Sequence, residues 1–188
     1  MAAQSNPTAV DTYAIYSKIM SAPPVGFGNE RYAIAATTRI PMGGNVCIEP
    51  PASYSDRWDQ VLEDFNARRN APATLERLLT VSTPYTFITP DEESAFKSVR
   101  GGGLPRRTHP ETTPAPAPSP KTLGPKFEGV TTIFYLGDVY FSRDRTLALT
   151  GIGMWCGGLC GSVQWMIYER LDATWTLVRP SRSCYVDV

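Results

Sequence analysis

The chain has 188 residues, which is enough for one domain with a sizeable core, and its 18 basic residues balance its 18 acidic residues. This balance gives no electrostatic argument for nucleic acid or an anionic membrane surface as a partner, and we expect no nucleic-acid ligand. No apolar run approaches the roughly 20 residues of a membrane-spanning helix, so we expect no transmembrane segment.

Composition divides the chain into three parts, which we predict to form a single domain overall. Residues 1–98 show mainly helical patterns with short strands, whereas residues 127–188 show β patterns. Between them, residues 99–126 contain seven prolines and four glycines with hardly an apolar side chain. Such a segment buries too little surface to offset its ordering entropy, which predicts a flexible, solvated insertion.

The first part begins with a pattern that predicts a helix over about residues 8–20, followed by a strand within residues 31–40. A second, amphipathic helix then starts with Ser53 or Ser55 as its N-cap and carries its apolar side chains on one face. We expect another helical turn or two at "ATLERLL", residues 73–79.

A short strand is predicted at "YTFI", residues 85–88, directly before a helix start. Thr89 is placed to cap this helix, Pro90 to occupy its first position and Glu92 to complete a capping box.

The last part contains four segments that are rich in β-branched or aromatic residues. Short turns at "SRDR", "CGGLCG" and "LDAT" separate them. This pattern predicts an antiparallel β-meander with the N-terminal helices packed on one face, and hence an α+β fold. With tight hairpins, Trp155, Trp165 and Trp175 would lie at equivalent heights on successive strands. On one face of the sheet they would be core, and on an open face they would form a binding platform.

The chain resembles an uncharacterised family of bacterial exported proteins, many of them lipoproteins. The resemblance covers residues 55–97 and 128–179, interrupted by the proline-rich segment, and rests on these positions: Asp64-Phe65-Asn66, Asn70, Ser142, Ala148-Leu149, Cys156-Gly157, Leu159-Cys160-Gly161 and a closing Trp175. Arg143-Asp144-Arg145 departs from the glycine-phenylalanine-asparagine that is usual in the family. The resemblance implies an extracytoplasmic (periplasmic or secreted) setting and brings no biochemical role.

The N-terminus lacks the basic region and the continuous apolar stretch of a signal peptide. An exported form would therefore have lost its leader, and a lipid anchor lost in the same way is the one route we expect to a membrane. A cytosolic origin is compatible with the same N-terminus.

Cys156 and Cys160 flank a glycine-rich turn and allow several interpretations. A zinc site would need further ligands from Cys47, Cys184 or the lone His109. A thioredoxin-like redox pair has two residues between its cysteines and lies at a helix N-terminus. Here three residues separate the cysteines, and the predicted setting is a β-turn. A cysteine nucleophile needs a histidine base, and the lone histidine lies in the flexible insertion.

A disulfide that closes the hairpin turn is favoured over these interpretations, because glycines permit the positive φ values of a tight turn. Cys47 and Cys184 would then form a second, long-range pair. Reduced, buried cysteines are the remaining alternative. Bridging implies an oxidising compartment, and we expect no metal and no cofactor.

These patterns favour a non-catalytic exported binding or interaction domain, with the stapled hairpin and its neighbouring aromatic residues as the recognition edge. The candidate ligand-binding residues are Trp155, Trp165, Tyr168 and Arg143. The expected partner is a protein or a carbohydrate.

Two enzymatic alternatives stay open. The first is a histidine-independent hydrolase that uses a bound metal or carboxylates drawn from Glu49, Asp138, Asp144 and Glu169. It predicts a cleft in which two acids converge and in which a pKa is shifted. The second is a thiol redox protein, which requires an exposed cysteine at the hairpin turn with a lowered pKa.

Overall fold

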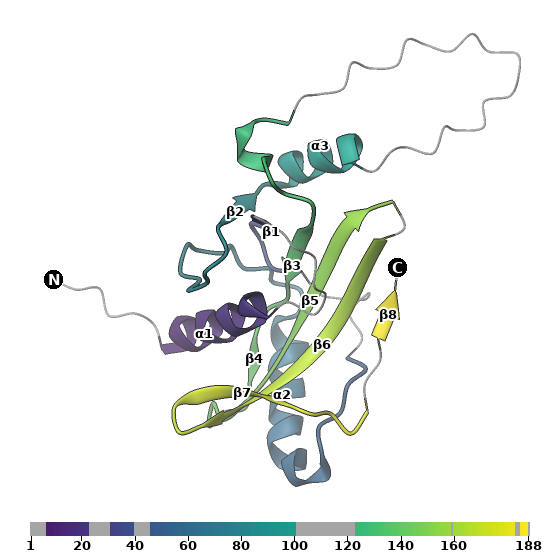
Figure 1. Cartoon of the computed structure of the whole chain (residues 1–188). Helices are drawn as coiled ribbons and strands as arrows, with labels where there is room; N and C mark the ends of the chain where they lie inside the picture. The colour runs from purple at the N-terminus through teal and green to yellow at the C-terminus, as the bar shows by residue number, and fades with distance from the viewer. Residues whose placement is uncertain are drawn as a thin grey trace, which may run out of the picture.

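The computed structural model describes residues 7–22, 31–39, 46–100, 123–158, 160–182 and 185–187. Within these residues three α-helices and one mixed sheet form an α+β fold, as predicted (Figure 1). The helices are α1 (Pro7–Ser21), α2 (Ser55–Arg68) and α3 (Pro90–Arg100), with the short 3-10 helices η2 (Ala52–Tyr54) and η3 (Pro125–Phe127). The strands are β1 (Tyr32–Ala35), β2 (Tyr85–Ile88), β3 (Ile133–Leu136), β4 (Tyr140–Phe141), β5 (Leu147–Gly157), β6 (Cys160–Leu171), β7 (Thr174–Val178) and β8 (Tyr185–Asp187).

The sheet runs in the order β2-β1-β3-β5-β6-β7, and from β3 onward it is the predicted antiparallel meander. The two short strands of the first part extend it, because β1 pairs in parallel with both β2 and β3. β4 pairs with the start of β5, and β8 pairs with β6 beyond the end of β7. β7 and β8 therefore share one side of β6.

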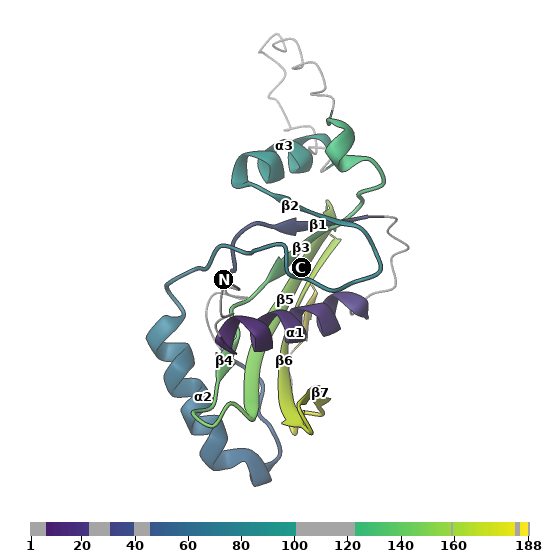
Figure 2. The ribbon, with the colours of Figure 1, turned by 90° about the vertical axis from the view of Figure 1, so that its left-hand side faces the viewer.

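The N-terminal helices cover both faces of the sheet, whereas the sequence had suggested one face. Apolar residues of α1 pack with Met166 and Tyr168 of β6, while those of α2 pack with Trp165 and Ile167. Successive residues of a strand point to opposite faces, so these two clusters lie on opposite sides of the sheet. The four consecutive apolar residues 165–168 are the sequence signal for a strand buried on both faces. Figure 2 shows α1 crossing the sheet.

The predicted capping box of α3 is confirmed. The Thr89 backbone N–H donates to the Glu92 carboxylate over 2.8 Å, and the Glu92 N–H donates to Thr89 Oγ1 over 3.3 Å. The predicted serine cap of α2 is wrong: its N-cap is Tyr54, which makes no side-chain capping bond. η2 runs directly into α2, and the Ser55 N–H donates to the Ala52 carbonyl, so the 3-10 turn takes the place of a capping side chain.

The helical turn expected at residues 73–79 is also wrong, since this segment is not helical and Thr74 forms an isolated β-bridge with Thr37. The Thr38 N–H donates to the Ala73 carbonyl, and the Leu75 N–H donates to the Ala36 carbonyl, both over 2.8 Å. Long-range backbone pairing with the chain after β1 has overridden the local helical pattern.

Only the ends of the predicted proline-rich insertion belong to the described residues. α3 continues to Arg100, and η3 begins at Pro125, so both ends have regular structure. Residues 101–122, including His109, lie outside the described residues. None of the helices in the described part of the chain combines the length and apolarity needed to cross a bilayer.

Candidate functional site

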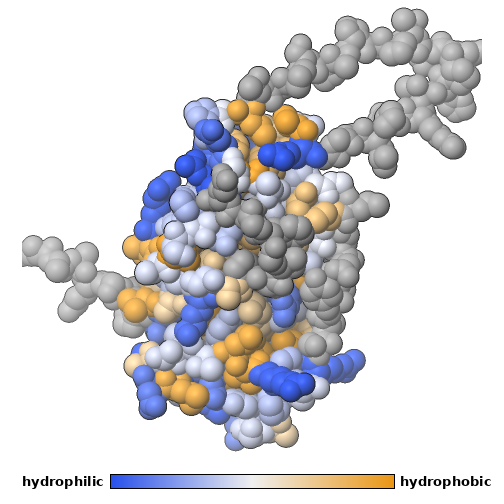
Figure 3. Space-filling view, viewed as in Figure 1, coloured by the Kyte–Doolittle hydropathy of each residue, from blue (hydrophilic) through white to orange (hydrophobic). Residues whose placement is uncertain are grey.

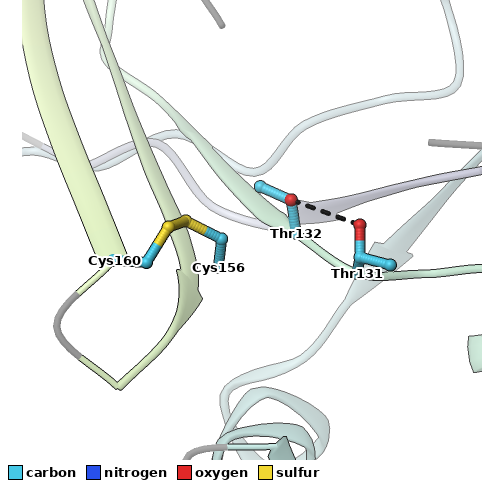
Figure 4. The surroundings of a disulfide bond; sticks show 4 residues. All are labelled: Thr131, Thr132, Cys156 and Cys160. Carbon is cyan, nitrogen blue, oxygen red and sulfur yellow. Dashed lines mark hydrogen bonds between the residues drawn. A yellow bond between two sulfur atoms is a disulfide. The ribbon is translucent and has the colours of Figure 1, made fainter. Parts of the chain in front are cut away.

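The predicted disulfide between Cys156 and Cys160 is present at the end of the β5–β6 hairpin, with 5.2 Å between the two Cα atoms (Figure 4). Gly157 and Gly158 follow Cys156 with φ values of 107° and 48°, the positive values for which glycine was expected. Cys47 is disulfide-bonded as well, and its predicted partner Cys184 lies outside the described residues. The bonded sulfurs at the hairpin are not available as thiolate ligands for zinc, and no group of three or more His, Cys, Asp or Glu side chains suited to a metal occurs among the described residues.

The three tryptophans of the meander do not lie at equivalent heights. Trp165 pairs with Gly151 in the middle of β5, Trp155 lies near the far end of that strand, and Trp175 pairs with Arg170 near the opposite end of β6. Each tryptophan belongs to or packs against a different apolar cluster: Trp155 lies with α3, Trp165 with α2 and Trp175 with α1. The expectation of one aligned aromatic row was therefore wrong.

The predicted binding residues are distributed over separate parts of the molecule. Trp165 is only 2% exposed and belongs to the core against α2, which excludes it from an open binding platform. Trp155 is half-buried beside the disulfide, where its ring lies 6.0 Å from Phe96 and below the Lys97 ammonium. Tyr168 is buried, but it lines a groove between α1 and β7, whereas Arg143 lies in a polar cleft beside α2.

Within the part of the chain that the structure describes, β7 forms a free edge of the sheet (Figure 2). The β6–β7 hairpin closes through a two-residue turn, Asp172 and Ala173, whose φ values of 47° and 66° define the turn type that matches strand twist. In such a hairpin the residues flanking the turn exchange backbone hydrogen bonds, and every second residue after them does the same. Trp175 and Leu177 therefore direct their backbone N–H and C=O groups away from β6.

No strand among the described residues pairs with the outer side of β7. Natural edge strands are commonly protected by charged side chains, proline or a bulge. The sequence of β7, Thr-Trp-Thr-Leu-Val, has neither a charge nor a proline, and its register with β6 is continuous. With respect to the described residues, the outer edge of β7 thus keeps the hydrogen-bonding capacity of a strand template.

A groove of about 520 Å³ lies next to this edge, and we call it the edge groove. Its walls come from the C-terminal half of α1, from β6 and from β7; the lining residues are Ser17, Lys18, Ile19, Ser21, Ala22, Thr80, Met166, Tyr168, Thr176 and Leu177. Leu177 is 55% exposed there, and Lys18 is the one charged residue of the lining. Figure 3 shows hydrophobic surface among hydrophilic residues on the lower half of the molecule, where Figure 1 places β7.

A second hollow, of about 620 Å³, lies between the first turn of α1, α2 and the turn after β4, and we call it the arginine cleft. It is lined by Thr8, Gln60, Glu63, Asp64, Ala67, Arg68, Phe141, Arg143, Arg145. Sequence reasoning had selected only Arg143 of this set as a binding residue. The ion pair between Arg143 and Glu63 spans 80 residues of sequence, so no local pattern could have indicated it.

The pKa values of two carboxylates near Arg68 are shifted in opposite directions. Burial alone would raise the pKa of Asp64, but hydrogen bonds from Arg68 and from the Phe141 N–H outweigh it and hold the pKa below its ordinary value. Burial raises the pKa of Asp138, and the charge of Arg68 and a hydrogen bond from Thr38 offset only part of this effect. Asp64 lines the arginine cleft, whereas Asp138 is not among the residues of its wall.

Comparison with known protein families, with curated proteins and with solved structures found no match for this chain. The resemblance to exported bacterial proteins therefore stays a prediction.

Proposed function

We propose that this protein is a non-catalytic interaction domain that binds an extended peptide segment of a partner protein along the free edge of β7. The observation that carries the proposal is the coincidence of an unpaired strand edge with an apolar groove directly beside it. Strand addition uses these two features together: main-chain hydrogen bonds supply affinity, and pockets for alternate side chains supply specificity. A carbohydrate ligand would have no use for the strand template.

The position of Leu177 determines which side chain of such a peptide would enter the edge groove. A peptide residue opposite Leu177 would exchange backbone hydrogen bonds with it and would point to the same face of the sheet. That face carries Met166 and Tyr168, which form an apolar floor together with Ile19 of α1. A large apolar side chain at this position would fill the groove, and its burial is worth about 1.5 to 3 kcal/mol.

Lys18 adds a charge preference at the rim of the groove. It is exposed, and no carboxylate stands among the residues that line the groove with it. An acidic residue beside the apolar anchor of the peptide would therefore meet an unopposed ammonium group, whose contribution would weaken with added salt.

The test is a selection of random peptides on phage against the full chain, followed by affinity measurement with the selected peptides in solution. We expect a family of sequences with an apolar anchor and neighbouring β-formers. Leu177→Lys should weaken binding roughly tenfold or more, because it removes the apolar wall and adds a second cation. Leu171→Lys is the matched control, since Leu171 is 51% exposed on β6 and lies outside the groove. Equal effects of the two substitutions would contradict the proposal, and so would the absence of any selected family.

We propose an extracytoplasmic setting for this interaction domain. The disulfide at the hairpin and the bonded state of Cys47 support it, because such bonds persist in oxidising compartments. Thiol counting on the denatured protein, with and without reductant, followed by mapping of the bridges, tests this setting. We expect no free thiols before reduction and a Cys47–Cys184 peptide pair.

A histidine-independent hydrolase is the second candidate, and the opposite pKa shifts of Asp64 and Asp138 favour it. Carboxyl groups whose pKa values are pushed apart are typical of acid and base pairs in hydrolases. Assays with p-nitrophenyl glycosides and esters between pH 4 and 8 test this candidate. Turnover that is lost in both Asp64→Asn and Asp138→Asn would favour it over the interaction domain.

A further inference from the structure

The arginine cleft lies away from the edge groove and has the chemistry of a binding site of its own. Three guanidinium groups and two carboxylates are in its wall, so the lining residues carry a net charge of +1. Arginine presents several N–H donors in a planar fork that matches the oxygens of a carboxylate, sulfate or phosphate.

Two of the three arginines are held in fixed positions. Arg145 donates to Thr8 Oγ1 over 2.9 Å and to Asp11 Oδ2 over 2.7 Å, and its guanidinium stacks 5.0 Å from the Phe141 ring. Arg68 makes two 2.6 Å hydrogen bonds to Asp64 and donates to the Val139 carbonyl. The cleft is therefore organised before any ligand arrives, which lowers the cost of binding.

Arg143 is different, because its backbone is fixed while the partner of its guanidinium group can be exchanged. Its backbone N–H donates to Gln60 Oε1 over 2.9 Å, which anchors the turn on α2. Its guanidinium meets Glu63 at 2.7 Å, with the two side chains 75% and 64% exposed. An ion pair this exposed contributes about 0 to 1 kcal/mol, so a ligand can replace Glu63 at little cost.

We propose that the arginine cleft binds a small ligand that carries an oxyanion group, namely a carboxylate, sulfate or phosphate. Arg143 releases Glu63 and takes the anionic group of the ligand, while Arg145 and Arg68, which keep their own partners Asp11 and Asp64, border the site. In the free protein Glu63 occupies the position of the ligand's charge and competes with it for Arg143.

This competition gives a test with effects of opposite sign. Inorganic phosphate, sulfate and citrate are titrated separately into the full chain by calorimetry, in a buffer of low ionic strength. We expect at least one of them to bind. Arg143→Gln should weaken that binding about tenfold, as expected for loss of a charge-assisted hydrogen bond, whereas Glu63→Gln should tighten it several-fold.

The matched control is another exposed pair on the same protein. Arg182 meets Glu49 at 3.8 Å with exposures of 77% and 61%, and neither residue lines the cleft. Arg182→Gln and Glu49→Gln change net charge in the same way as the two cleft substitutions, and we expect less than a twofold change in affinity from either. The proposal is overturned if none of the three anions binds, if Arg182→Gln weakens binding as much as Arg143→Gln, or if Glu63→Gln fails to tighten it.

Discussion

The N-terminal half of α1 is fixed to the sheet by polar bonds, whereas its C-terminal half stands beside an open groove. In the first half, the Asp11 carboxylate is buried and accepts hydrogen bonds from Arg145, Arg170 and Trp175 Nε1. In the second half, Ile19 is buried, but Lys18 faces the edge groove beside the exposed Leu177.

This difference shows how the fold can be rigid and still offer a surface for strand addition. Arg145 in the turn before β5, Arg170 on β6 and the indole of Trp175 on β7 locate one end of the helix and thereby set the width of the groove at the other end. If the anchor at Asp11 positions α1, then its loss should affect both stability and binding, whereas changes in the groove should affect binding alone.

The largest expected effect comes from Asp11→Ala. The substitution removes the shared acceptor of Arg145, Arg170 and Trp175, and leaves partly buried donors without a partner. We expect a loss of about 3 kcal/mol in the free energy of unfolding, measured by urea denaturation.

Lys18→Ala serves as the control in the other half of the same helix. Lys18 is exposed, and its removal should change the free energy of unfolding by less than about 0.5 kcal/mol. Similar losses for the two variants would mean that Asp11 is not the anchor.

The hairpin disulfide should have a smaller effect. Closing a short loop limits the entropy of the unfolded chain only modestly, so replacing both Cys156 and Cys160 by alanine should cost about 2 kcal/mol. Urea denaturation of the double variant under non-reducing conditions, in which the bond at Cys47 is kept, measures this loss. A loss as large as that of Asp11→Ala would show that the bond supports the packing of Trp155 against α3 as well as the turn.

The smallest expected effect is that of Glu93 on α3, and it depends on pH. Burial by itself would raise the pKa of Glu93, but hydrogen bonds from Arg39, Lys97 and Tyr135 outweigh it and lower the pKa below the ordinary value of 4.5. A carboxylate with a lowered pKa stabilises the fold fully above pH 4.5, and this contribution is lost as the pH falls through the lowered value.

Glu93→Gln should therefore cost about 1 kcal/mol at neutral pH, because the two cationic partners of Glu93, Arg39 and Lys97, are more than a third exposed. The variant should also lose less stability than wild type on going from pH 5 to pH 3. Thermal unfolding across this range measures both effects, and parallel pH profiles for the two proteins would contradict the assignment.

The sequence was informative where the structure depends on local chemistry. The turn residues between β5, β6 and β7, the Thr89–Glu92 capping box and the disulfide are encoded within a few residues, and all were predicted. The α+β class followed from the same local patterns.

The parts that were missed depend on contacts between distant segments. Residues 73–79 form backbone hydrogen bonds with the chain after β1, which no helical periodicity could reveal. The edge groove and the arginine cleft each combine α1 with strands more than 100 residues away, so the sequence showed single residues of them, Tyr168 and Arg143, without their neighbours. The burial of Trp165 by α2 has the same cause.

Strand addition at β7 is tested most directly by amide hydrogen exchange at single residues, with and without a selected peptide. The proposal predicts that the outward N–H groups of Trp175 and Leu177 exchange rapidly in the free protein and become protected in the complex. The N–H groups of Thr174 and Thr176, which face β6, should change little. Protection confined to the hairpin disulfide or to the arginine cleft, with Trp175 and Leu177 unchanged, would contradict it.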